Sequence, residues 1–182
     1  QNLYNKLDSQ EFRNLLKEKL NLNNEKHNKE IGYIGNFDSA NLILHIAKSI
    51  TGYENPWHVD TRKRIIHFLI YFGDEDIEEG GQIAIGEHSK LNKATDYLQY
   101  PEINNLTNIK YIEPKNNTAV FLLAQNNAYH KGCLLKGTRR FIYGGYTNVN
   151  GPAWHINTKW SNGYNFSQQM DTFRKSIKLN KT

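Results

Sequence analysis

The chain has 182 residues and a mass of 21.2 kDa, the size of a single domain. Apolar residues make up 38% of it, too many for a disordered chain, and no apolar run approaches the ~20 residues of a membrane-spanning helix. The net charge of +5 is scattered without a long basic block, so a nucleic-acid partner is disfavoured and no membrane partner is expected. The single cysteine, Cys133, excludes an internal disulfide and favours a reducing compartment, so we expect a cytoplasmic protein.

Helical patterns come first along the chain. Asp8 and Glu11 are spaced as in a capping box, and leucines at helical spacing follow them, which predicts a helix that begins here. The polar stretch Asn21–Glu30 is predicted to be a loop. Apolar residues at helical spacing, with Gly52 just beyond them, predict a second helix over Asp38–Ile50.

Strand-like segments dominate after this second helix. They are rich in β-branched and aromatic residues and are bounded by glycine, proline or paired asparagines. The predicted strands are Arg64–Phe72, Gln82–Ile85, Ile109–Ile112, Thr118–Leu123 and Arg139–Thr147. Short strands after a helical opening favour a mainly β fold with flanking helices, in the form of an antiparallel sandwich or barrel.

Two segments outside these strands complete the expected organisation. The stretch Glu87–Asn108 is too long for a hairpin turn, and we expect a partly helical excursion over the mouth of the barrel. Apolar residues at helical spacing predict a third helix over Ser167–Leu179. We expect a single domain over residues 1–182, with helical support in 1–52, the β core in 53–150 and an extension in 151–182.

The segment His58-Val59-Asp60 has the clearest chemistry. In an extended segment, residues two apart point to one face, so His58 and Asp60 can present a nitrogen and an oxygen to a common point. His130, which follows the predicted strand Thr118–Leu123, is the candidate third ligand. Two histidines and one carboxylate on one face of a metal leave three positions open, which is typical of non-haem Fe(II) oxygenases.

An arginine follows the candidate ligands in the last predicted strand. A buried arginine there needs an anionic partner, and the carboxylate of a small ligand suits its planar fork. Iron together with such an arginine describes a site for 2-oxoglutarate. Strand alternation lets only one of Arg139 and Arg140 face the site. Arg140 and Arg139 are the two candidates.

The order of these motifs resembles that of the Fe(II)- and 2-oxoglutarate-dependent oxygenases, closest to the prolyl-hydroxylase-like branch. The matching segments are Pro56–Asp60, Arg64–Phe72, Gly80–Ile83, Pro114, Thr118–Phe121, His130, Lys136–Arg140 and Tyr146. The resemblance therefore runs over about half of the chain. It implies a double-stranded β-helix, a jelly-roll type of double sheet, as the core, buttressed by the N-terminal helices.

The resemblance also implies a role for individual residues. His58, Asp60 and His130 would hold Fe(II). 2-Oxoglutarate would bind the iron and place its far carboxylate on Arg140, with Tyr71 as a second donor. The family's spacings from the second histidine and to the later aromatic residue, here His130 and Tyr146, favour Arg140, and Arg139 stays as the alternative. Dioxygen would be the co-substrate, and ascorbate is a further candidate as a supporting reductant. His67 faces the site by strand parity, and it either bonds 2-oxoglutarate or fills space.

The expected activity, as the resemblance implies it, is hydroxylation of a C–H bond with release of succinate and CO2. The retained Asp60 favours hydroxylation, because halogenating relatives replace this carboxylate with a small residue. The substrate would be a small molecule, an amino acid, a peptide or a sugar-type compound, chosen by the loops around the barrel mouth. The sequence indicates no oligomeric state. Two other classes stay open: a non-catalytic jelly-roll binding module and a cupin-type metal-dependent isomerase or hydrolase.

Overall fold

The computed structural model describes residues 2–30, 37–60, 64–73, 75–92, 96, 98–124 and 127–147. In these ranges the helices are α1 (Leu3–Leu7), α2 (Gln10–Lys19), α3 (Glu25–Glu30) and the 3-10 helix η1 (Ile103–Asn105). The strands are β1 (Asn41–Ile50), β2 (Asn55–His58), β3 (Arg64–Tyr71), β4 (Ile77–Gly80), β5 (Ile83–His88), β6 (Leu106–Ile112), β7 (Ala119–Leu123), β8 (Tyr129–Gly132) and β9 (Leu135–Thr147). Among these described helices, none has the length and apolar character to span a membrane. The predicted helix Ser167–Leu179 lies outside the described residues.

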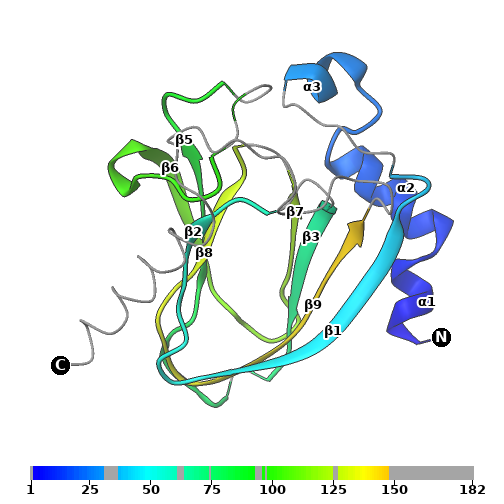
Figure 1. Cartoon of the computed structure of the whole chain (residues 1–182). Coiled ribbons are helices and arrows are strands. Elements are labelled where there is room, and N and C mark those ends of the chain that lie inside the picture. Colours follow the sequence, from blue (N-terminus) through cyan, green and yellow to red (C-terminus); the bar gives the residue numbers. More distant parts are fainter. Residues whose placement is uncertain are drawn as a thin grey trace.

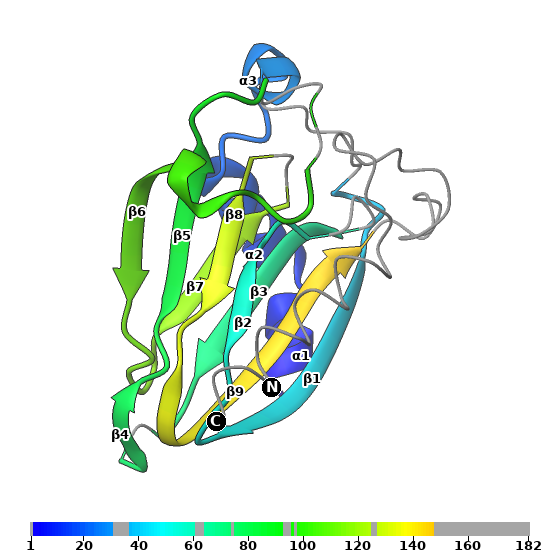
Figure 2. The same cartoon turned by 60° about the vertical axis from the view of Figure 1, so that its left-hand side comes forward.

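The strands form two antiparallel sheets that lie face to face (Figures 1 and 2). The order in the larger sheet is β1-β9-β3-β7, and β4 pairs with the first residues of β9. The order in the smaller sheet is β2-β8-β5-β6. This arrangement confirms the predicted mainly β class and the jelly-roll type of double sheet.

The helices α1 and α2 lie against the outer face of the larger sheet (Figure 1). Leu7 of α1 and Leu16 of α2 belong to one buried cluster. The same cluster contains Ile66 and Phe68 of β3 and Tyr146 of β9. Strand alternation turns the residues between these positions toward the smaller sheet. The helices therefore leave the inner face of the larger sheet free to line a site between the two sheets.

Residues 41–50 form a strand, so the helix predicted over Asp38–Ile50 is wrong. β1 pairs with β9 along its whole length, from Asn41 opposite Thr147 to Ile50 opposite Thr138. The isoleucines that produced the helical spacing are β-branched, which suits a strand, and a ladder of this length outweighs a weak local helical preference. The strands of the core therefore begin at Asn41 rather than after residue 52.

The first predicted helix is present as α2, but a different residue caps it. The side chain of Ser9 accepts the backbone N–H of Phe12 at 3.2 Å, with the extended backbone of an N-cap residue. Asp8, the predicted cap, pairs instead with Arg13 at 2.6 Å. The predicted loop Asn21–Glu30 contains the short helix α3.

Every predicted strand is present, as β3, β5, β6, β7 and β9, with ends displaced by a few residues. The strands β2, β4 and β8 were not predicted as strands, because each has only four residues and none is a continuous apolar run. In the described part of the excursion Glu87–Asn108, the helical content is η1, which leads directly into β6.

Arg13 anchors α2 to the segment that leads into β1. Its guanidinium donates to the carbonyls of Phe37 and Ala40, both at 2.9 Å, and its side chain is 9% exposed. We expect Arg13→Leu to lower the free energy of unfolding by about 3 kcal/mol, because it leaves the carboxylate of Asp8 and two carbonyls without their partner. Urea unfolding measures this loss. The control Lys6→Ala removes an exposed ion pair and should cost less than about 1 kcal/mol, so equal losses would contradict the anchoring role.

Candidate metal centre

Two histidines face each other across neighbouring strands of the smaller sheet. His58 ends β2 and stands directly opposite His130 of β8 in the strand register. Asp60 lies two residues beyond His58 in the chain. One ring nitrogen of each histidine and one carboxylate oxygen of Asp60 lie within 4.8 Å of one another. The structure therefore brings the three predicted metal ligands together.

Backbone carbonyls orient both histidine rings. Nδ1 of His58 lies 2.7 Å from the carbonyl oxygen of Pro56, and Nδ1 of His130 lies 3.2 Å from that of Ala128. A carbonyl only accepts, so each Nδ1 carries the proton and each Nε2 keeps its lone pair. Nε2 of His130 is buried without a hydrogen-bond partner among the described residues. A metal ion suits this arrangement, because histidine ligands commonly donate their other ring N–H to a carbonyl or carboxylate.

Burial controls the protonation of the three side chains. Burial lowers the pKa of His58 and lowers that of His130 to about 3. Burial alone would raise the pKa of Asp60, but interactions with neighbouring groups, above all His67, hold it well below its usual range. At neutral pH the site therefore presents two neutral imidazoles and one carboxylate, which are the protonation states that bind a divalent metal.

The metal-free protein is expected to lose stability as the pH falls below about 6.5. The pKa of His130 is about 3 in the folded protein against 6.5 in the unfolded chain, so between these values the unfolded state binds the extra proton. Such a group lowers the free energy of unfolding by up to about 1.4 kcal/mol per pH unit in this window. Urea midpoints measured across the window check the slope. The variant His130→Phe should flatten it, and an unchanged slope would contradict the assignment.

The structure turns Arg139, rather than Arg140, toward the candidate ligands. Arg139 is 3% exposed and shares a cavity of about 130 Å³ with all three of them. Arg140 pairs with Asp76 at 2.5 Å, and 39% of its side chain is exposed. The preference for Arg140 therefore does not hold, and the alternative that sequence analysis kept is the arginine that lines the cavity.

Strand parity explains why the arginine assignment moves by one residue. Phe141 and Tyr143 line the same cavity as Arg139, as expected for alternate residues of one strand. Tyr146, whose spacing favoured Arg140, instead packs on the outer face of the sheet. Its hydroxyl donates to the carbonyl of Leu7 in α1 at 2.5 Å. Tyr146 and Arg140 therefore share the outer face of β9.

Arg139 lies among aromatic rings and has no carboxylate partner in the described part of the chain. Its Nη1 donates to the carbonyl of Gly81, and its Nε is buried without a partner among the described residues. Its guanidinium carbon lies 5.2, 5.8 and 4.8 Å from the ring centres of Tyr53, Tyr71 and Phe141. The hydroxyl of Tyr71 is likewise buried without a described partner, and burial raises the pKa of Tyr71 to about 12, so it stays protonated. These two unsatisfied donor groups fit a carboxylate of a bound ligand.

Sequence analysis did not single out two residues that also line the cavity. Arg64, the first residue of β3, lies 3.3 Å from the carboxylate of Asp60. Its guanidinium also bonds the hydroxyl of Tyr143 and lies 4.8 Å from the centre of that ring. Tyr143 could have been predicted as a cavity residue, because it is four residues from Arg139 in the same strand and therefore faces the same side. No sequence signal of comparable clarity marks Arg64.

Part of the excursion Glu87–Asn108 lies against the segment that carries His58 and Asp60. The carbonyl of Gln99 accepts the backbone N–H of Val59 at 3.0 Å. The carbonyl of Leu98 accepts the hydroxyl of Tyr129 at 2.6 Å, and the ring of Tyr100 lies 6.4 Å from the ring of His58. The excursion therefore supports both strands that carry the candidate histidines.

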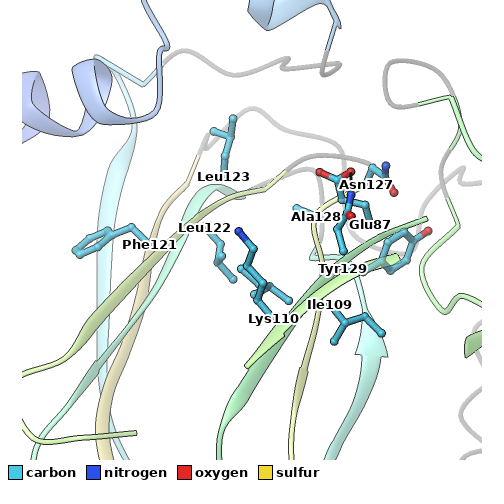
Figure 3. Close-up of a pocket in the computed structure, with 12 residues that line it drawn as sticks. Glu87, Ile109, Lys110, Phe121, Leu122, Leu123, Asn127, Ala128 and Tyr129 are labelled. Carbon is cyan, nitrogen blue, oxygen red and sulfur yellow. Dashed lines mark hydrogen bonds between the residues drawn. The ribbon is translucent and has the colours of Figure 1, made fainter. Parts of the chain in front are cut away.

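A larger cavity, of about 510 Å³, is lined by a different set of residues from the cavity that contains the candidate ligands (Figure 3). Residues of β5, β6 and β7 line it, among them Lys110 and Leu122, together with Asn127. The buried amide of Asn127 already accepts the backbone N–H of His88 at 2.6 Å. The lining residues include neither histidine nor arginine, so the chemistry favours the smaller cavity as the functional site.

Comparison with known proteins gives a family match and several distant structural similarities. The family model of the 2OG-Fe(II) oxygenase superfamily matches residues 44–148. No curated protein matches the chain.

Three solved structures are similar to this chain at low identity. A Pseudomonas putida prolyl-4-hydroxylase is 14% identical with a TM-score of 0.43, over 76% of this chain and 62% of that one. A 2OG-Fe(II) oxygenase-family oxidoreductase from Burkholderia pseudomallei is 12% identical with a TM-score of 0.49, over 82% and 58%. A structure reported with prolyl 4-hydroxylases from Phytophthora capsici is 16% identical with a TM-score of 0.35, over 98% and 55%. The alignments therefore cover less than two thirds of each of these chains. The family model, in contrast, matches more than half of this chain, from β1 to the end of β9, and the protein belongs to the 2OG-Fe(II) oxygenase superfamily.

Proposed function

We propose that the chain is a 2-oxoglutarate-dependent non-haem iron dioxygenase that hydroxylates a C–H bond. The substrate would be a small molecule, an amino acid, a peptide or a sugar-type compound. The observation that carries the proposal is one cavity lined both by the three candidate metal ligands and by the buried Arg139. A metal site alone would also suit an isomerase or hydrolase of the cupin type, which has little use for a buried arginine without a carboxylate partner.

Each side chain has a defined task in this proposal. His58, Asp60 and His130 hold Fe(II), and Arg139 with Tyr71 binds the far carboxylate of 2-oxoglutarate. Iron with 2-oxoglutarate and dioxygen supplies the oxidising chemistry, in which 2-oxoglutarate becomes succinate and CO2 and the substrate gains a hydroxyl group. The protein binds and orients these reactants between its two sheets.

The size of the cavity supports binding of the cosubstrate inside it and of the substrate at its opening. Its volume of about 130 Å³ is far below the ~300 Å³ of a pocket for a drug-sized ligand, so it suits one small molecule. The apolar side chains of Leu69, Ile83 and Phe141 line part of the cavity. They would exclude water from the far carboxylate of 2-oxoglutarate. The substrate would meet the site on the side of the partly exposed Arg64 and Tyr143.

Succinate release tests the proposal directly. The purified chain with Fe(II), 2-oxoglutarate and dioxygen is expected to form succinate, and a true substrate from a metabolite and peptide panel should stimulate this turnover. Anaerobic addition of Fe(II) and 2-oxoglutarate should also produce the visible charge-transfer absorption of the chelate. Metal binding without the chelate absorption and without succinate would contradict the proposal. It would favour the alternative of a non-catalytic jelly-roll binding module.

A further inference from the structure

The two oxygens of Asp60 lie in different surroundings. Oδ1 lies 4.0 Å from Nε2 of His58, on the side of the other candidate ligands. Oδ2 lies 2.8 Å from Nδ1 of His67 and 3.3 Å from Nη1 of Arg64. The carboxylate therefore turns one oxygen toward the common point of the ligands and the other toward two nitrogen donors.

His67 is well placed to hold the second oxygen. It points to the inner face of β3, is 6% exposed, and its ring centre lies 5.3 Å from those of both His130 and Tyr143. Neither ring nitrogen forms an aligned hydrogen bond with a described residue, but Nδ1 approaches the carboxylate of Asp60 to 2.8 Å. The second torsion of a histidine side chain is soft, so a small turn of the ring aligns Nδ1–H with Oδ2.

We infer that His67 is a positioning residue that restricts Asp60 to binding the metal through one oxygen, which rests on the proposed role of Asp60 as an iron ligand. A carboxylate with both oxygens free can occupy two positions on a metal, whereas an N–H bonded to one oxygen keeps that oxygen off the metal. A site with two histidines and one carboxylate needs three open positions for cosubstrate and dioxygen. His67 thereby preserves a position that a two-oxygen Asp60 would fill.

Arg64 contributes less to this restraint than His67. It approaches the same Oδ2 at the longer distance of 3.3 Å, and 23% of its side chain is exposed against 8% for His67. Solvent screens the partly exposed guanidinium more than the buried ring, and the guanidinium also bonds the hydroxyl of Tyr143, so it does not serve Oδ2 alone. A substitution of His67 alone should therefore release the carboxylate.

Binding of Co(II) in the absence of 2-oxoglutarate tests the inference. His67→Phe keeps an aromatic ring but removes the donor, and it should weaken Co(II) binding by about 10- to 100-fold. It should also change the visible spectrum of bound Co(II), because the carboxylate can then bind through both oxygens. His67→Asn places an amide N–H near the position of Nδ1 and should recover most of the affinity and the original spectrum.

The matched control is another buried histidine. His88 is 7% exposed, and its Nδ1 accepts the backbone N–H groups of Lys90 and Leu91 rather than contacting a candidate ligand. His88→Phe should keep the affinity for Co(II) even if its melting temperature falls. A loss of affinity shared equally by both phenylalanine variants would overturn the inference, because it would report a general loosening of the fold.

The remaining outcomes separate this inference from the proposed function. Equal Co(II) affinity and identical spectra in the wild type and His67→Phe would overturn the inference and leave the proposed function standing. A His67→Phe variant that binds Co(II) normally but no longer binds 2-oxoglutarate would also overturn it, and would assign His67 to the cosubstrate. If the wild-type chain binds no Co(II), the proposed function itself fails.

Discussion

Replacing His130 by alanine is expected to abolish iron-dependent formation of succinate and to weaken metal binding by more than about 100-fold. Partners that merely orient a ligand already contribute 10- to 100-fold to metal affinity, and in the proposed site His130 would supply a ligand nitrogen itself. The low pKa of about 3 means that no proton competes for this nitrogen at neutral pH. Calorimetric titration with Co(II) and the succinate assay measure the two losses.

The control for this variant must be a buried histidine outside the ligand set. His88→Ala should keep metal affinity and turnover, since His88 holds backbone N–H groups of the chain that follows β5. The fold of His130→Ala is checked by its far-UV spectrum and melting curve. A folded His130→Ala protein that still binds Co(II) with wild-type affinity would remove His130 from the metal site.

Replacing Arg139 by alanine is expected to raise the 2-oxoglutarate concentration for half-maximal turnover by roughly 10- to 150-fold. Hydrogen bonds to charged groups contribute about 1.5–3 kcal/mol, and the buried guanidinium has no described carboxylate partner that competes for it. Metal affinity should stay within a factor of about three. Arg139→Lys keeps the charge but loses the planar fork, so it should fall between the wild type and the alanine variant.

Arg140→Ala is the matched control, since it removes a neighbouring arginine that pairs with Asp76 on the exposed side of β9. It should leave the requirement for 2-oxoglutarate nearly unchanged. The opposite ranking of the two alanine variants would mean that the cavity assignment of Arg139 is wrong. A matching rise in both would show that the overall positive charge, rather than a specific contact, attracts the cosubstrate.

Two of the three candidate ligands, His58 and Asp60, could be placed on one face from the sequence because their relation is local. His58 and Asp60 are two residues apart in extended chain, so their shared direction follows from strand geometry without knowledge of any partner. Which of two adjacent arginines faces inward depends instead on the whole length of β9. That strand begins at Leu135, before the predicted start, and its inner face is defined by pairing with β3, where Tyr143 stands opposite Leu69.

The helix predicted over Asp38–Ile50 failed for a related reason. Its apolar residues satisfy a helical period, but the segment gains a full ladder of hydrogen bonds from β9, which lies about half the chain away in sequence. A local pattern contains no information on so distant a partner. The N-cap residue of α2 also differs from the prediction. Asp8 forms an ion pair with the guanidinium of Arg13, and Ser9 caps the helix instead.

The pairing of β2 with β8 implies that the candidate metal would also stabilise the edge of the smaller sheet. β2 is a four-residue strand at the edge of its sheet, and it pairs with β8 at only two positions, one of which is His58 opposite His130. A metal held by both histidines would link β2 to β8 as a cross-link does. Binding of the ion and pairing of these two strands would then be thermodynamically linked. Loss of the ion would let β2 fray and would expose unpaired backbone to proteases. In a cell the supply of iron would then govern how long the protein survives as well as how fast it works.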